Sequence, residues 1–345
     1  MLVTQSSWIT RARTRGIVET MSATVLCFGE ILLRLSSPNK EVLLQSARFD
    51  AQVGGAEANV AVSLSKFGHA AAMVSTLPES PLARACAGEL RRHGVQTDAI
   101  RFREGRMGLY FLTHGAGHRP AEVLYDRAGS AFAVASADAY DWNALLTGCS
   151  WLHVSGITPA VSDAAGEAAL AAMTAARQRG VKISFDCNFR ARVWAARAKQ
   201  APAVLRKLCE PADLIFGDER DFTFMFEGDA DAAFAACKNL QFVACTSRAR
   251  HSADTQEISG SLRSRRDTYT TRPYSLYGIV DRIGAGDAFA AGVLHGLIRS
   301  FDPQKTIDFA TAAAVLKHSI HGDFNLVGEA DVELLLSEHR TDVRR

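Results

Sequence analysis

Residues 281–292 read Asp281-Arg282-Ile283-Gly284-Ala285-Gly286-Asp287-Ala288-Phe289-Ala290-Ala291-Gly292, a glycine turn followed by an aspartate and a small, apolar, helix-like run. Glycine permits positive φ angles and lets the backbone approach a ligand closely. The first amides of the following helix have no intrahelical partners, and the helix dipole adds positive potential there, so the stretch predicts an anion site. The alternative is a glycine turn that caps an ordinary helix, with Asp287 as the capping acid.

Asp287 would stand at the mouth of this anion site. A carboxylate beside a bound phosphate is electrostatically unfavourable, so its presence favours a chemical role. We predict that Asp287 accepts a proton from a hydroxyl that attacks a phosphoryl group, while Gly284, Ala285 and Gly286 hold that group.

The composition excludes several classes of protein. The 345 residues include 39 basic and 37 acidic ones, so nothing favours a nucleic acid or a membrane surface as partner. Seven cysteines at scattered spacings favour a reducing compartment. No apolar run approaches the roughly 20 residues of a membrane helix. We therefore expect a cytoplasmic protein.

The first 22 residues differ from the rest. Arg11, Arg13 and Arg15 precede the first acid, Glu19. An organellar transit peptide has this bias. We favour a disordered extension over 1–22, because the core-like pattern begins only at Val25, and we predict one domain over 23–340.

Apolar, strand-like runs alternate with helix-like runs along most of the chain. The predicted strands cover 25–28, 151–154, 181–185, 214–216 and 242–245, and a typical helical segment covers 162–179. This alternation predicts an α/β fold: an open, mainly parallel sheet with helices on both faces. Ligands bind beyond the carboxyl ends of such strands.

Two segments, near 37–53 and 101–127, break this alternation. Residues 106–112 and 121–125 are typical of paired strands, so we predict a small antiparallel sheet that acts as a lid and excludes water. The polar segment 248–272 is predicted to be a loop or hairpin near the site.

A second glycine motif, Gly54-Gly55-Ala56-Glu57-Ala58-Asn59, precedes a helix-like run. Together with the stretch at 281–292, it resembles the two signatures of the ribokinase-like (PfkB) carbohydrate kinases. The resemblance implies that Gly54, Gly55 and Asn59 contact sugar hydroxyls and that Asp287 is the base. It also implies ATP and Mg²⁺ as cofactors and leaves open whether K⁺ activates. A homo-oligomer formed through the lid would fit this family.

Three further segments, 125–131, 185–190 and 316–325, resemble 2-keto-3-deoxygluconate kinases. The resemblance implies that Arg127 and Arg190 hold an acidic keto-sugar, and guanidinium suits a carboxylate. Each arginine could instead pair with its neighbour, Asp126 or Asp186. Tyr110 and Tyr125 either offer hydroxyls to the sugar or pack within the lid.

The sequence departs from the family pattern at several positions. Asp218 and Asp221 replace the asparagine and glutamate of the metal-linked motif, and we expect them to act on Mg²⁺ through water. The usual glycine-containing nucleotide turn is replaced by 246–253, and Ile283 replaces a common threonine. The predicted nucleotide-binding residues are Asn188, Ser247, Arg248, Gly284 and Gly286.

For Arg282 and His318, which lie near these motifs, the sequence permits two interpretations each. Arg282 meets the transferring phosphate or pairs with a surface acid, and His318 lines a nucleotide or cation loop over 318–325 or is a satisfied helix-end histidine. For the whole chain we predict a kinase for a sugar acid, 2-keto-3-deoxygluconate by resemblance. A kinase for a neutral ketose or a nucleoside, and a sensor without turnover, remain alternatives.

Overall fold

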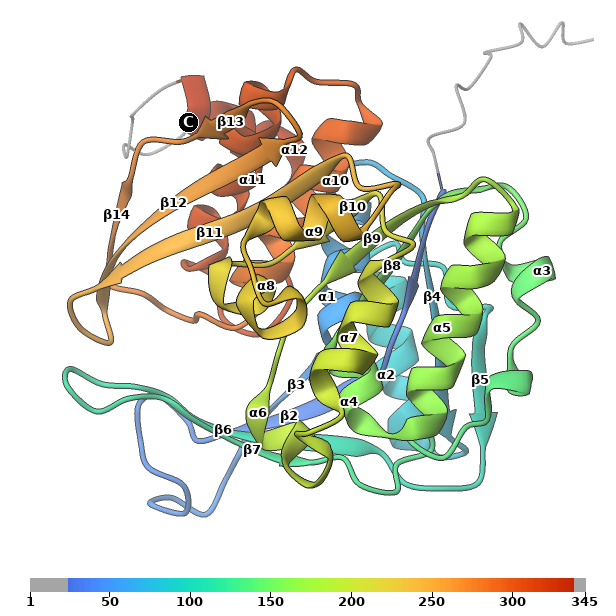
Figure 1. Ribbon diagram of the computed structural model, residues 1–345. Coiled ribbons are helices and arrows are strands. Elements are labelled where there is room, and N and C mark those ends of the chain that lie inside the picture. The colour runs from blue at the N-terminus through green and yellow to red at the C-terminus, as the bar shows by residue number, and fades with distance from the viewer. Residues whose placement is uncertain (1–23, 338–345) are drawn as a thin grey trace, which may run out of the picture.

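The computed structural model describes residues 24–337, so the predicted extension over 1–22 lies outside the described residues. A ten-stranded sheet forms its centre (Figure 1). Its strands are β1 (Thr24–Phe28), β4 (Ala71–Pro78), β5 (Ile100–Arg103), β8 (Cys149–Ser155), β9 (Lys182–Asp186), β10 (Leu214–Phe216), β11 (Phe242–Arg250), β12 (Thr255–Ser264), β13 (Thr268–Thr270) and β14 (Tyr274–Tyr277). Their order is β13-β12-β11-β10-β9-β8-β1-β4-β5, with β14 paired to β12.

The strands from β5 to β11 pair in parallel, as the sequence predicts, and β12 to β14 add an antiparallel edge. The side chains of successive residues in β1 lie on opposite faces of the sheet, because side chains alternate along a strand. Val25 and Cys27 belong to one core, and Leu26 and Phe28 belong to the other. All five predicted strands are present.

Helices cover both faces of this sheet (Figure 1). One core receives α1 (Ala56–Lys66), α2 (Pro81–Arg92), α10 (Ala285–Ile298), α11 (Pro303–Lys317) and α12 (Glu329–Ser337). The other core lies with α3 (Trp142–Leu145), α4 (Ile157–Val161), α5 (Asp163–Gln178), α6 (Ala191–Trp194), α7 (Ala201–Cys209), α8 (Glu219–Phe226) and α9 (Ala230–Ala236). Short 3-10 helices cover Ala137–Ala139 and Ala195–Arg197. Among residues 24–337, no helix has the length and apolar character to cross a bilayer.

A second, smaller sheet lies at the bottom of Figure 1, where the lid was predicted, and it is called the lid below. Its strands are β2 (Leu32–Ser36), β3 (Asp50–Gly54), β6 (Gly108–Thr113) and β7 (Glu122–Asp126), in the order β3-β2-β6-β7. The predicted pairing of two strands within 106–125 is confirmed, with Tyr110 opposite Tyr125. The sequence did not predict β2, which pairs in parallel with β6 between two antiparallel pairings. Of the segment 37–53, only the part from Asp50 is strand.

The segment after β10 forms a long hairpin rather than a short strand and a turn. β11 runs on to Arg250 and pairs antiparallel with β12. The predicted loop or hairpin over 248–272 is therefore mostly hairpin, and Ser247 and Arg248 lie within a strand instead of a turn.

Candidate active site

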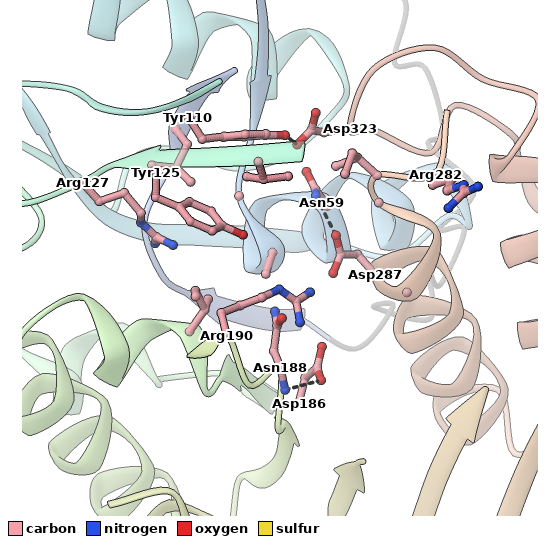
Figure 2. A pocket seen from close by; sticks show the side chains of 18 of the residues that line it. Asn59, Tyr110, Tyr125, Arg127, Asp186, Asn188, Arg190, Arg282, Asp287 and Asp323 are labelled. Atoms are coloured by element: carbon pink, nitrogen blue, oxygen red, sulfur yellow. Dashed lines mark hydrogen bonds between the residues drawn. The ribbon is translucent and has the colours of Figure 1, made fainter. Parts of the chain in front are cut away.

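The two glycine motifs meet at the site (Figure 2). Asp287 lies in the first turn of α10, and its Oδ2 accepts a hydrogen bond of 2.7 Å from Nδ2 of Asn59, 228 positions away in the chain. Gly284 precedes the helix with a φ of 82°, in the left-handed region. A Cβ on Gly284 would lie 1.9 Å from the carbonyl oxygen of Asp323, so this position requires glycine.

Burial raises the pKa of Asp287 to about 7. The hydrogen bond from Asn59 and the charge of Arg190 oppose this shift, and the carboxylates of Asp323 and Glu57 add to it. A base whose pKa lies near neutral pH is well matched to proton transfer at that pH. The side chain is only partly buried, so one side remains open to the cavity.

A cavity of about 420 Å³ lies in front of Asp287. The predicted site residues that line it are Gly55, Asn59, Tyr110, Tyr125, Arg127, Asn188, Arg190, Arg248, Gly284, Gly286 and Asp287. The predicted residues that do not line it are Gly54, Ala285, Ser247, Asp218 and Asp221. The cavity also includes Asp186 and Asp323, which the sequence analysis did not select.

The paired glycines allow close packing at the start of α1. A Cβ on Gly55 would lie 2.3 Å from the carbonyl oxygen of Glu30, and φ there is 142°. A Cβ on Gly54 would lie 2.0 Å from Oδ2 of Asp323. Gly54 therefore leaves space for the side chain of Asp323 and does not itself line the cavity.

Asp186 is the last residue of β9, and Asn188 follows two positions later. Oδ1 of Asp186 accepts a hydrogen bond of 3.1 Å from the backbone N–H of Asn188, whose φ of 36° is unusual for a residue other than glycine. Burial raises the pKa of Asp186 to about 7, and the nearby charge of Asp287 adds to the shift. The position of Asp186 at a strand end was the signal in the sequence that could have identified it.

The two predicted sugar-acid arginines differ in their surroundings. Arg127 is buried, and its Nε donates to Oε2 of Glu30 at 2.6 Å. Asp126, the alternative partner, pairs with Arg106 instead. Arg190 is exposed and forms no ion pair among residues 24–337, so the alternative pair with Asp186 is absent as well.

The two predicted site tyrosines, Tyr110 and Tyr125, have different surroundings. The hydroxyl of Tyr110 is buried and donates to Oδ2 of Asp323 at 2.5 Å. Tyr125 is partly buried, and its ring centre lies 6.2 Å from that of Tyr110. Tyr110 thus packs within the lid as one interpretation expected, and Tyr125 points toward the cavity in Figure 2.

A positively charged wall faces Asp287 from the hairpin. Burial lowers the pKa of Arg248 to about 10, with further contributions from Arg250, Arg282 and Arg190. Among the described residues, Nε of Arg248 has no hydrogen-bond partner. Nη2 of Arg282 donates to the carbonyl of Ala253 at 2.6 Å, so Arg282 anchors the hairpin turn, and it forms no ion pair with an acid in the range 24–337. Such a wall would attract an anion.

Asp218 and Asp221 begin α8 and form its capping box. Oδ1 of Asp218 accepts the backbone N–H groups of Arg220 and Asp221, and Oδ2 of Asp221 accepts the N–H of Asp218. Oδ2 of Asp218 pairs with Arg220 at 2.5 Å. The predicted water-mediated metal role stays a prediction for both residues. In Asp218 the capping contacts engage Oδ1, and the ion pair with Arg220 engages Oδ2.

His318 caps the C-terminus of α11. Its Nδ1 lies 2.6 Å from the carbonyl oxygen of Ala314, and burial lowers its pKa to about 4. His318 is therefore a helix-end histidine, but it is only half satisfied, because its buried Nε2 has no hydrogen-bond partner among residues 24–337.

Comparison with known proteins places this geometry in a family. A family model described as pfkB family carbohydrate kinase matches residues 22–325. A 2-dehydro-3-deoxygalactonokinase from Haloferax volcanii is 32% identical over 325 residues, which cover 92% of this chain and 97% of the relative.

Solved structures agree with this assignment. The crystal structure of a 2-dehydro-3-deoxygluconokinase from Thermotoga maritima is 37% identical, covers 92% of this chain and 100% of its own, and superposes with a TM-score of 0.87. A fructokinase from Xylella fastidiosa with bound ATP is 22% identical, covers 91% and 98%, and has a TM-score of 0.76, which shows the shared fold. The chain belongs to the pfkB family of carbohydrate kinases.

Proposed function

We propose that this kinase transfers the γ-phosphoryl group of ATP to 2-keto-3-deoxygluconate and forms its 6-phosphate. The observation that carries the proposal is the position of Asp287. Its partly open carboxylate, with a pKa near 7, lies at the start of α10 and faces a cavity that arginines line.

In the proposed reaction, Asp287 orients the terminal hydroxyl of the sugar and accepts its proton. The hydroxyl oxygen bonds to the γ-phosphorus as the bond to the bridging oxygen of ADP breaks. The turn at Gly284, Ala285 and Gly286 stabilises the charge on the transferred group, because its amides and the helix dipole are already oriented before reaction. Asn59 holds the carboxylate of Asp287 in place through its 2.7 Å hydrogen bond.

Two arginines support an acidic substrate. Arg190 is unpaired among the described residues and lines the cavity, so its charge is available to a carboxylate. Arg127 lines the same cavity, but Glu30 already neutralises it, so we assign it a directional contact with the sugar. Tyr125 lies between them in Figure 2 and could donate a further hydrogen bond.

The proposal includes ATP with Mg²⁺, and the donor groups at the site fit such a cation. Asp186 and Asp287 both have pKa values raised by burial, and a cation beside them would favour their ionised forms. Asp221, whose charge acts on Asp186, would join them through water, with Asp218 beside it. When bound, Mg²⁺ would neutralise charge on the phosphates. Asn188, Ser247 and Arg248 stay our candidates for nucleotide contacts.

The test is ADP release with Mg·ATP and five acceptors: 2-keto-3-deoxygluconate, 2-keto-3-deoxygalactonate, fructose, ribose and adenosine. We expect a clear preference, in kcat/KM, for the first. A preference for the galactonate would keep the acidic pocket and change the epimer. Turnover of only a neutral sugar or nucleoside would refute the arginine assignment. Ligand binding without any turnover would favour a sensor.

A further inference from the structure

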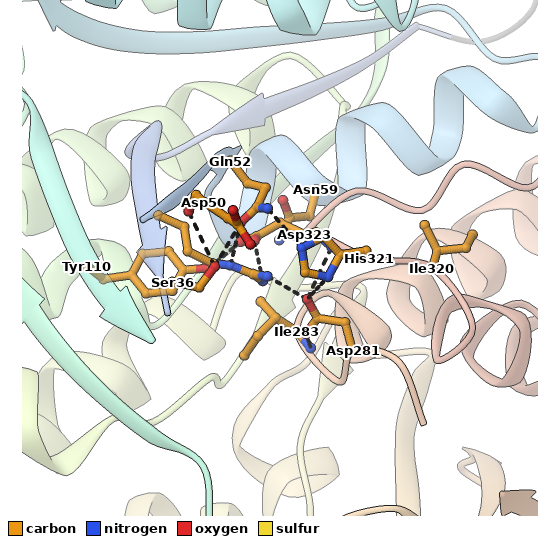
Figure 3. Close-up of polar contacts among 12 residues, drawn as sticks. Ser36, Asp50, Gln52, Asn59, Tyr110, Asp281, Ile283, Ile320, His321 and Asp323 are labelled. Carbon is orange, nitrogen blue, oxygen red and sulfur yellow. Dashed lines mark hydrogen bonds and ion pairs between the residues drawn. The ribbon is translucent and has the colours of Figure 1, made fainter. Parts of the chain in front are cut away.

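Beneath the glycine turn lies a group of buried charges that the proposed reaction does not use directly. Two carboxylates, Asp281 and Asp323, and two cations, Arg34 and Lys317, are each at most 3% exposed. Figure 3 shows how Asp281 and Asp323 join a network of polar contacts that includes Gln52 and Tyr110. Burial of ionised groups is unfavourable unless they are paired, so such a group calls for an explanation.

Arg34 connects the lid to both carboxylates. It lies on β2, and its Nη2 donates to Oδ2 of Asp281 at 2.6 Å while Nη1 donates to Oδ1 of Asp323 at 2.9 Å. Its Nε donates to Gln52 at 3.0 Å. One guanidinium therefore joins the lid strand, the segment before α10 and the C-terminal loop, which are distant in sequence.

Both carboxylates act on the glycine turn. Oδ1 of Asp281 accepts the backbone N–H of Ile283 at 3.0 Å, directly before Gly284. The carbonyl oxygen of Asp323 would lie 1.9 Å from a Cβ at Gly284, so the turn rests on this loop. A shift of either aspartate would therefore move the amides that are proposed to hold the phosphoryl group.

Lys317 lies on the other side of the same turn. Its Nζ donates to the carbonyl of Ile320 at 3.0 Å, and its Cε lies 3.2 Å from the position that a Cβ on Gly284 would take. Burial lowers its pKa to about 8, while the charges of Asp281 and Asp323 oppose this shift. The ammonium is held by one backbone carbonyl and attracted by the charges of Asp281 and Asp323, so it supplies a positive charge where a small monovalent cation could otherwise bind.

Asp281 has little capacity for another cation. Its Oδ2 also accepts the N–H of Gly322 at 3.1 Å. His114 and His321 lie close enough that one ligand atom from each of the three residues falls within 4.8 Å. Nε2 of His321, however, lies 3.0 Å from the amide of Gln52, and Arg34 already pairs with Asp281. Backbone N–H groups and the guanidinium of Arg34 therefore already occupy the carboxylate oxygens of Asp281, which leaves little room for a bound cation.

We propose that Lys317 and Arg34 are built-in cations that position the Gly284–Gly286 turn, so that phosphoryl transfer needs no added monovalent cation at this place. Both are positioning residues, since Arg34 acts through its ion pairs with Asp281 and Asp323, and Lys317 acts through its packing beside Gly284. The inference deepens the proposed function and rests on it.

The first test uses the unmodified enzyme. Its kcat is measured with Mg·ATP and its best acceptor in K⁺, Na⁺ or tetramethylammonium chloride at equal ionic strength. We expect the three rates to agree within about twofold, which is small beside the effects of a misplaced catalytic group. A rate that requires K⁺ would overturn the proposal. An enzyme inactive toward every acceptor would instead count against the proposed function.

The second test removes the ammonium and offers replacements. Lys317→Ala should lower kcat by at least about 10-fold, with little change in KM for the sugar, because small displacements of catalytic groups cost up to about 10²-fold. NH₄⁺ or K⁺, but not tetramethylammonium, should restore part of the loss. Lys305→Ala, at the exposed start of the same helix, is the matched control and should show neither effect.

A third readout does not depend on turnover. A cation that binds the folded Lys317→Ala variant raises its Tm. We expect NH₄⁺ to raise it relative to tetramethylammonium and to leave the unmodified enzyme unchanged. A folded variant with normal kcat, or a loss that no cation affects in either rate or Tm, would refute the cation role. If Lys317→Ala does not fold, Arg34→Lys offers the same kinetic test, with reduced kcat and unchanged sugar KM expected.

Discussion

The assignment of Asp287 as the base makes a quantitative prediction about pH. With a pKa of about 7, the carboxylate is fully ionised well above neutral pH and loses its proton-accepting form as pH falls. Hence kcat/KM for Mg·ATP, which reports the enzyme before the cation binds, should drop to about a tenth of its plateau at pH 6 and about a hundredth at pH 5. An aspartate with an ordinary pKa of about 3.9 would instead leave the rate nearly constant over this range.

The assay should measure the sugar phosphate directly, because coupling enzymes also respond to pH. Asp287→Asn keeps the size of the side chain and its contact with Asn59 but removes the base. It should lower kcat by at least ~10²-fold, the low end of base contributions, with little change in sugar affinity. Normal turnover by this variant, or a flat profile from pH 5 to 8 in the unmodified enzyme, would refute the reasoning.

Three more substitutions follow from the contacts at the site. Arg190→Ala should raise KM for sugar acids more than for neutral sugars, which steady-state kinetics with both classes would measure, because its charge is free to bind a carboxylate. Asp186→Asn should move the acidic limb of the pH profile of kcat/KM to lower pH, because Asp186 and Asp287 interact as like charges and the substitution removes one of them. Gly54→Ala should weaken sugar binding measured by calorimetry, because the new Cβ would lie 2.0 Å from Oδ2 of Asp323.

Matched controls separate these effects from general destabilisation. Arg192→Ala removes an exposed guanidinium two positions from Arg190 and should leave both KM values unchanged. Gly88→Ala adds a Cβ whose nearest neighbour is 3.8 Å away, so it should bind sugar normally. Equal KM changes for acidic and neutral sugars in Arg190→Ala, or an unmoved pH limb in Asp186→Asn, would contradict the corresponding assignment.

The main sheet could be predicted from the sequence because its parallel strands are buried on both faces. Such strands are largely apolar and lead into polar residues: β8 and β9 end at Ser155 and Asp186, and Asp218 follows shortly after β10. The contact between Asn59 and Asp287 could also be anticipated, since both residues follow a glycine turn at the start of a helix. Their shared hydrogen bond is a consequence of this arrangement.

The lid and its charges were harder to predict. β2 carries Arg34 in its centre, so its five residues do not form the apolar alternation that marks a strand. The partner of Arg34 could not be found locally, because Asp281 and Asp323 lie 247 and 289 positions away. Asp218 and Asp221 illustrate a different limit, since acids three positions apart suit a metal site and a capping box equally well.

The charges around the cavity give different roles to the two arginines that we propose bind the substrate, Arg127 and Arg190. Glu30 pairs with Arg127 inside the lid, so this guanidinium offers hydrogen-bond direction with little net charge. Arg190, which has no ion-pair partner in the described part of the chain, lines the cavity and its charge acts on Asp287. Selectivity for an acidic substrate would then depend mainly on Arg190. The contribution of Arg127 would depend on the position of the lid. Because Arg34 joins that same lid to the loops beside Gly284, lid position and the geometry of the glycine turn are physically connected.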